Sequence, residues 1–157
     1  MRIKWLTTFA SICALCLQFS SIAVAANTNT QQNLDQQEKP VKIAIDIQGQ
    51  TITATLKANS AAVDDFVAQL PLSLTLTDYA ATEKVADLPK RLSTKGEPSG
   101  TSAKAGDITY YAPWGNLAIF HKSFGHASGL VKLGSMDSGV DLMRKSGAFD
   151  VTIRLAD

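Results

Sequence analysis

Cysteine is scarce in this sequence, which has only two among 157 residues. Both Cys13 and Cys16 lie in an apolar stretch near the start, and no cysteine follows them. A disulfide framework and a cysteine-based metal site are therefore excluded for the rest of the chain. The C-x-x-C spacing is a redox or metal pattern in other settings, but inside an apolar leader we discount it.

A strong charge of either sign is also missing. The chain has 15 lysines and arginines against 14 aspartates and glutamates, a formal net charge of +1. Such a balance gives no basic footprint for nucleic acid, so we expect no nucleic-acid partner. Ten glycines and five prolines are ordinary numbers and exclude a collagen-like or low-complexity chain. The length allows one domain.

Motifs that carry catalysis are absent as well. The sequence has no metal-ligand spacing, nucleophile motif or phosphate-binding loop. The only histidines are His121 and His126, and neither has an acidic partner or a nucleophile in a local motif. We expect both to be solvated or structural, and we expect no metal site and no cofactor.

The N-terminus has the three parts of a secretory signal peptide. Arg2 and Lys4 precede an apolar run over residues 5–19, and Ala23-Val24-Ala25 supplies a small-x-small end. We expect a signal peptide over residues 1–25, cleaved after Ala25, with cleavage after Ala26 as the alternative. The protein is then periplasmic or secreted.

Two alternatives to cleavage fit less well. An uncleaved membrane anchor needs about 20 apolar residues, more than this run provides. A lipoprotein needs a small residue before the modified cysteine, whereas Ile12 precedes Cys13 and Leu15 precedes Cys16. We therefore expect no membrane span after cleavage. Residues 26–40 are almost entirely polar and predict a flexible leader, which places the folded domain at residues 41–157.

Alternation of apolar and polar residues predicts strands. The clearest pair covers residues 41–48 and 51–56 around a turn at Gly49, which is typical of a hairpin. The segment 117–120 is apolar on both faces and indicates a central strand. The remaining predicted strands cover residues 72–77, 85–86, 107–112, 116–121, 130–133 and 149–155.

Two short helices complete the prediction. The first covers residues 62–70, with Asn59 or Ser60 as its cap and Pro71 at its end. The second follows Ser138 and Asp141, which resemble a capping box, and stops at Gly147. Residues 93–106 and 123–129 are rich in small and polar side chains and predict loops.

Seven or eight short strands and two helices favour an all-β fold. The helices are too few for alternating β-α-β units. A closed antiparallel β-barrel of about eight strands, capped by the helices, fits best because closure leaves no exposed strand edge.

A family resemblance points the same way. Residues 106–120, with Asp78-Tyr79-Ala80, Glu83-Lys84 and Leu88-Pro89 upstream and the last helix and strand, resemble the bacterial cyclophilin-like domain family. The likeness covers residues 41–156. It implies an eight-stranded barrel capped by two helices, as in cyclophilins.

The resemblance does not carry over an isomerase site. Prolyl isomerases of this fold place an arginine on a barrel strand beside an apolar proline pocket. After the predicted leader this sequence has only Arg91, Arg144 and Arg154, and none matches that pattern. The glutamine- and phenylalanine-rich run of the isomerases is replaced by residues 116–120. No catalytic residue is therefore assigned.

The candidate binding residues gather around one predicted turn. Tyr111, Trp114 and Asn116 combine aromatic surface with hydrogen-bonding groups, and Tyr79 is expected to join them. Arg91 is a possible charged contact, although residues 83–91 form a mixed charge run that usually marks a solvated face. The alternative for the aromatic residues is core packing, with Trp114 covering a barrel end.

Two functions of different classes remain open. The first is a non-enzymatic module that binds a peptide segment or a small ligand, and we expect it to act as a monomer. The alternative is a peptidyl-prolyl cis-trans isomerase with rearranged catalytic residues. A purely structural role in a larger assembly is a third possibility.

Overall fold

The computed structural model describes residues 39–157. The predicted signal peptide over residues 1–25 and nearly all of the predicted leader lie outside the described residues. Within the described part, no helix is long and apolar enough to cross a membrane.

The described chain forms ten strands and two short helices. In chain order they are β1 Val41–Ile47, β2 Gln50–Leu56, α2 Ala61–Val67, β3 Leu72–Tyr79, β4 Glu83–Asp87, β5 Gly100–Ala103, β6 Asp107–Tyr111, β7 Asn116–Phe120, β8 Phe124–Ser128, β9 Leu130–Met136, α3 Val140–Met143 and β10 Phe149–Leu155.

Eight of these strands close into an antiparallel barrel, which confirms the predicted fold class. The order around the barrel is β1-β10-β3-β4-β7-β6-β9-β2, and β2 returns to β1. The predicted hairpin closes it, with Ile45 opposite Ile52. Gln48 and Gly49 both have positive φ, the conformation that a two-residue hairpin turn needs.

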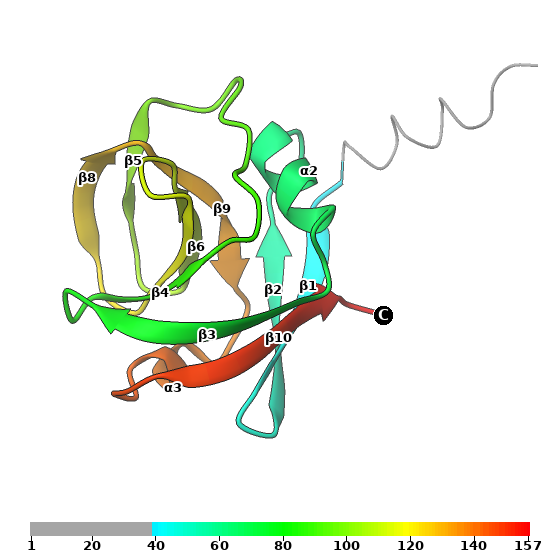
Figure 1. Ribbon diagram of the computed structural model, residues 1–157, viewed down its shortest axis with the longest axis vertical. Helices are drawn as coiled ribbons and strands as arrows, with labels where there is room; N and C mark the ends of the chain where they lie inside the picture. Colours follow the sequence, from blue (N-terminus) through cyan, green and yellow to red (C-terminus); the bar gives the residue numbers. More distant parts are fainter. Residues whose placement is uncertain (1–38) are drawn as a thin grey trace, which may run out of the picture.

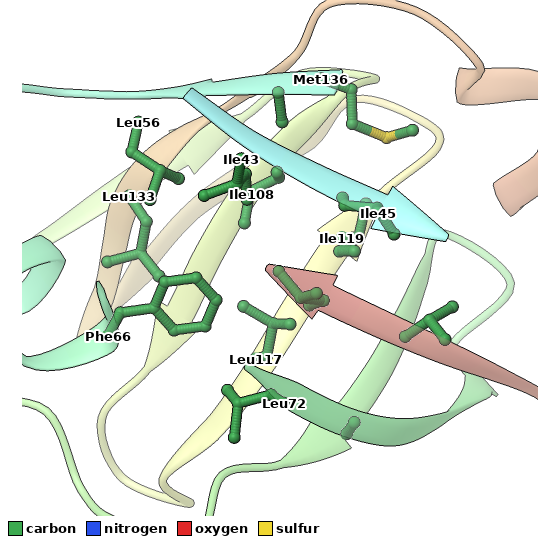
Figure 2. Close-up of a cluster of buried hydrophobic side chains, with 14 of the residues drawn as sticks. Ile43, Ile45, Leu56, Phe66, Leu72, Ile108, Leu117, Ile119, Leu133 and Met136 are labelled. Carbon is green, nitrogen blue, oxygen red and sulfur yellow. The ribbon is translucent and has the colours of Figure 1, made fainter. Parts of the chain in front are cut away.

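The main core fills the barrel. Inward-facing aliphatic residues alternate along the strands, and Figure 2 shows a group of them converging from several strands and from α2. Both helices contribute fully buried side chains, Ala62 and Phe66 from α2 and Met143 from α3. Figure 1 shows the two helices on opposite sides of the barrel, in agreement with the predicted caps.

The two helix starts differ in chemistry. At α2 the Ser60 hydroxyl accepts a hydrogen bond of 3.2 Å from the Val63 backbone N–H, as one of the two predicted caps requires. At α3 the predicted capping box is wrong. Gly139, in a left-handed conformation, is the N-cap and no side chain caps the helix. The helix ends at Met143, before Gly147.

A second correction concerns the two predicted loops. Residues 93–106 contain strand β5, and residues 123–129 contain β8. The two pair with each other as a separate two-stranded sheet outside the barrel, here called the ribbon. Figure 1 places β5 and β8 beside β6 and β9. Both strands are short and poor in apolar residues, so they lack the alternation on which strand prediction depends.

Strand β7 is buried on both faces, as predicted from its apolar run. Leu117 and Ile119 point into the barrel core. Ala118 and Phe120 point outward and join Ala103 and Leu130 in a smaller apolar cluster. This outer cluster exists because the ribbon covers part of the outer barrel surface, and the candidate site lies next to it.

Candidate functional site

A cavity of about 170 Å³ opens on the outer surface of the barrel, between strands β4, β7 and β6 and the ribbon. We call it the groove. Its lining residues are Tyr79, Glu83, Val85, Tyr111, Trp114, Asn116, Ala118, Phe120, Phe124, Ala127 and Leu130.

The floor of the groove is apolar. Val85 of β4 lies opposite Ala118 of β7, and Glu83 lies opposite Phe120, so these four residues share one outward face. Phe120 is almost fully buried, because its ring also packs on Phe124 at 5.5 Å between centroids. The floor is therefore part of the packed outer cluster.

One wall of the groove is a row of three aromatic rings. The Trp114 indole lies between Tyr79 at 5.4 Å and Tyr111 at 5.3 Å, and both contacts are edge-to-face. Such pairs are favourable beyond the area they bury. Trp114 nevertheless remains 56% exposed. It is thus displayed at the rim, and the alternative in which it packs in the core is not what the structure shows.

The turn between β6 and β7 holds Trp114 in place. The Gly115 N–H donates to the Tyr111 carbonyl at 2.8 Å, and Gly115 has a positive φ that suits glycine. The Arg91 guanidinium donates to the carbonyl of Ala112 at 2.7 Å and to that of Pro113 at 3.3 Å. Arg91 therefore supports the turn and does not line the groove.

The ribbon supplies the opposite wall. Phe124 and Ala127 of β8 line the groove, and Phe124 is 39% exposed. The ribbon end is tied to the β6–β7 turn through Gly129, whose carbonyl accepts from the Ala112 N–H at 2.9 Å. A Cβ at Gly129 would lie 2.7 Å from the Pro113 ring, so this close approach requires glycine.

Two polar side chains stand at opposite ends of the floor. Glu83 is only 8% exposed, and the Thr82 hydroxyl donates to its carboxylate at 3.2 Å. Burial raises the pKa of Glu83, and the Thr82 hydrogen bond offsets part of that rise. Asn116 is also buried, and its Oδ1 has no hydrogen-bond partner among residues 39–157. Asn116 is four positions before Phe120, the β7 residue opposite Glu83, so the two ends lie about 13 Å apart along the strand at ~3.3 Å per residue.

The structure brings four of the five predicted site residues together around the groove: Tyr79, Tyr111, Trp114 and Asn116. Their role as ligand contacts stays a prediction. Sequence reasoning missed Glu83 and Phe124. The alternation of Glu83 with Val85 was the available signal for the first, whereas Phe124 fell in a segment predicted to be a loop.

The interpretation of residues 83–91 as a solvated charge run is wrong for its first two members. Glu83 faces the groove, and Lys84 on the opposite face of β4 is fully buried. The Lys84 ammonium is paired with Asp78. The rest of the run agrees better, since Asp87, Lys90 and Arg91 are exposed.

A second hollow, of about 370 Å³, lies at the β3–β4 turn and includes His121, Lys122 and Arg144. His121 is buried, and its Nδ1 has no partner among the described residues. Burial, and then the nearby positive charges of Lys122 and Lys84, lower the pKa of His121. His121 is therefore not solvated, and its imidazole favours the neutral form, while the structural role expected from the sequence stays a prediction.

No arginine of the described chain lines the groove. Arg144 pairs with Asp141 and Arg154 with Asp46, while Arg91 is committed to the turn. No group of three or more histidine, cysteine, aspartate or glutamate residues between positions 39 and 157 is placed to hold a metal ion. The groove thus offers apolar surface, aromatic rings and two polar side chains.

Comparison with known proteins gives the family of the sequence and a similar solved structure. A model of the cyclophilin-like family matches residues 45–154. The solution structure of the hypothetical protein AF2241 from Archaeoglobus fulgidus is similar, with a TM-score of 0.56 and 15% identity over 74% of this chain and 95% of that chain. No curated protein matches. The family match spans most of the chain and agrees with the closed barrel, so the protein belongs to the cyclophilin-like family.

Proposed function

We propose that this protein is an exported binding module that holds an apolar group of a peptide segment or small ligand in the groove. The module acts as a monomer in the periplasm or after secretion. Its export rests on the N-terminal pattern of Arg2, Lys4 and the small-x-small end at Ala25. Its binding role rests on the groove.

The observation that carries the proposal is the open cavity with a preformed aromatic wall. An apolar cavity of roughly 150 Å³ holds a benzene molecule, so the groove of about 170 Å³ has room for one ring-sized group. Trp114 is held at the rim by Tyr79, Tyr111 and the supported turn. A preformed wall lowers the entropy cost of binding.

A non-enzymatic role is favoured because no cationic donor lines the groove. Prolyl isomerases of this fold polarise the prolyl amide with an arginine, and no arginine, lysine or histidine is among the lining residues. The alternative, a peptidyl-prolyl isomerase with rearranged residues, is tested by isomerisation of an Ala-Ala-Pro-Phe tetrapeptide. Activity well above background that is lost in Trp114→Ala would support the enzyme.

The binding proposal is tested by measuring stability and binding separately. Trp114→Ala is expected to lower the free energy of unfolding by about 1 kcal/mol or less, because the indole is half exposed. It should weaken the binding of benzyl alcohol and of the tetrapeptide at least tenfold in NMR titrations. Leu155→Ala removes another half-exposed apolar side chain, on β10 away from the groove, and is the matched control.

Two outcomes contradict the proposal. A loss of stability above about 3 kcal/mol would assign Trp114 to the core. Equal binding by the Trp114→Ala and Leu155→Ala variants would show that the groove is not where these probes bind.

A further inference from the structure

The groove presents aromatic ring faces and side-chain oxygens, and no lysine, arginine or histidine from positions 39–157 lines it. Glu83 is the only charged residue among those that line it. Asn116 presents an Oδ1 atom without a donor from any described residue. The nearest arginine along the rim, Arg91, directs its guanidinium to backbone carbonyls of the turn. Among residues 39–157, Asn116 Oδ1 has no donor and the Glu83 carboxylate has one, the Thr82 hydroxyl, so both groups can accept further hydrogen bonds.

The placement of Glu83 is costly unless something compensates it. Glu83 is only 8% exposed as a residue, it shares its face of the sheet with Val85 and Phe120, and one hydroxyl, that of Thr82, donates to its carboxylate. Taking a carboxylate out of water without a cation is unfavourable. Lys84 follows directly in sequence, but its ammonium lies on the other face of β4 with Asp78. A positively charged ligand would supply the missing partner.

One ring of the aromatic wall, that of Tyr79, lies at the Glu83 end of the floor. Tyr79 of β3 is directly opposite Glu83 of β4 in the sheet, and both line the groove. Trp114 then stands against Tyr79 with its ring plane turned by 86°. Ring faces carry negative charge density and attract cations, most strongly at tryptophan. Rings at right angles beside a carboxylate form a corner that suits an ammonium or guanidinium group.

We propose that the groove binds an organic cation, an ammonium or guanidinium group on an apolar stem. The cation lies between Glu83 and the rings of Tyr79 and Trp114, and the stem lies on Val85 and Ala118. This inference rests on the proposed binding function and names its ligand class. Two sources carry that chemistry: a small aryl or alkyl amine, and a basic side chain of a peptide.

Three probes of similar shape test the charge preference: benzylammonium, benzyl alcohol and benzoate, titrated into the full chain at pH 7.5 and followed by NMR. We expect benzylammonium to bind at least tenfold more tightly than benzyl alcohol, and benzoate to bind most weakly. Glu83→Gln, which keeps the shape of the side chain, should bring benzylammonium to within about twofold of benzyl alcohol. Asp87→Asn removes an exposed carboxylate from the same strand outside the groove and should leave the tenfold preference intact.

The outcomes separate the two proposals. If none of the three probes binds, the binding function itself fails. If benzyl alcohol or benzoate binds as tightly as benzylammonium, or if Glu83→Gln keeps the preference, the groove binds ligands but not cations, and this inference is overturned. If benzoate binds as tightly as benzylammonium, that result would instead fit a neutral Glu83 that donates a hydrogen bond.

A second pair of probes distinguishes the sources of the cation. Capped lysine, with acetyl and amide ends, is compared with its Nε-acetylated form. Tighter binding of capped lysine than of benzylammonium assigns the cation to a peptide side chain, and the reverse order assigns it to a small amine. In either case, Nε-acetylation should weaken binding at least tenfold, and an unchanged affinity would count against the inference.

Discussion

The ammonium of Lys84 lies 2.6 Å from a carboxylate oxygen of Asp78, although the lysine side chain is fully buried and the aspartate side chain is 42% exposed. Lys84 also donates to the Gly147 carbonyl at 2.7 Å, and its ammonium lies 4.6 Å from the centre of the Phe149 ring. Asp78 in turn accepts from the Gly147 N–H. The buried positive charge is thus compensated at the barrel rim, between β3, β4 and the start of β10.

This pair predicts unequal effects of removing its two members. Asp78→Asn leaves the Lys84 charge buried without its counter-ion and should cost about 3 kcal/mol of stability. Lys84→Met replaces the buried charge by an apolar side chain of similar length and should cost about 1 kcal/mol or less. Urea unfolding at pH 7 measures both, and a larger loss for Lys84→Met than for Asp78→Asn would contradict this reading.

The outer cluster predicts a second contrast, between two phenylalanines in ring contact. Phe120 is 1% exposed, so Phe120→Ala should cost about 3–5 kcal/mol, the range for a buried aromatic truncation. Phe124 on the ribbon is more than a third exposed, and its truncation should cost about 1 kcal/mol. Denaturant unfolding checks both values. A cost below about 1 kcal/mol for Phe120→Ala would mean that the outer cluster adds little to stability.

Arg91 is predicted to act on the groove through the turn. Arg91→Ala leaves the carbonyls of Ala112 and Pro113 without their charged donor and should cost about 1 kcal/mol. Because the turn carries Trp114, the same change should weaken probe binding severalfold. Lys90→Ala removes an exposed neighbouring charge and serves as the control. Loss of binding to an anionic probe alone would instead identify Arg91 as a direct charged contact.

Glu83 predicts a pH-dependent stability. Burial raises the pKa of this carboxyl group in the folded protein above its ordinary value of 4.5. Its contribution to the free energy of unfolding is therefore full below pH 4.5 and declines as pH rises through the raised value. Glu83→Gln removes this decline, so the variant should be more stable than the wild type at pH 7 and equal to it near pH 4. Unfolding curves from pH 4 to 8 measure the difference, with Asp87→Asn as the control for the loss of one negative charge.

The barrel was predictable from the sequence because most of its strands bury one face. The alternation of Ile43, Ile45 and Ile47 with polar residues is visible without a structure, as is the doubly apolar run of β7. The ribbon was not predictable, because β5 and β8 have only one buried residue between them and each depends on a partner 21 to 28 residues away in the sequence. Their stability comes from tertiary contact and not from local pattern.

The part of the site that is local in sequence was also predictable. Tyr111, Trp114 and Asn116 are close in sequence, so one turn brings them together. Glu83 was misinterpreted because a run of charged residues is usually exposed to solvent. Only the closed sheet shows that Glu83 faces the groove and that Lys84 is buried on the opposite face of β4. The α3 cap was misread because Ser138 and Asp141 have the right spacing, whereas Gly139 adopts the backbone conformation that starts the helix.

The separation of the ribbon from the barrel means that the two walls of the groove belong to different sheets. The aromatic wall stands on barrel strands β3 and β6 and the β6–β7 turn, and the other wall belongs to a two-stranded sheet outside the closed ring of strands. Side chains at positions 124 and 127 set the width of the groove, yet they add nothing to the packing inside the barrel. Substitutions there are expected to change which ligand fits while the packing inside the barrel stays intact, at the modest cost in stability expected for Phe124.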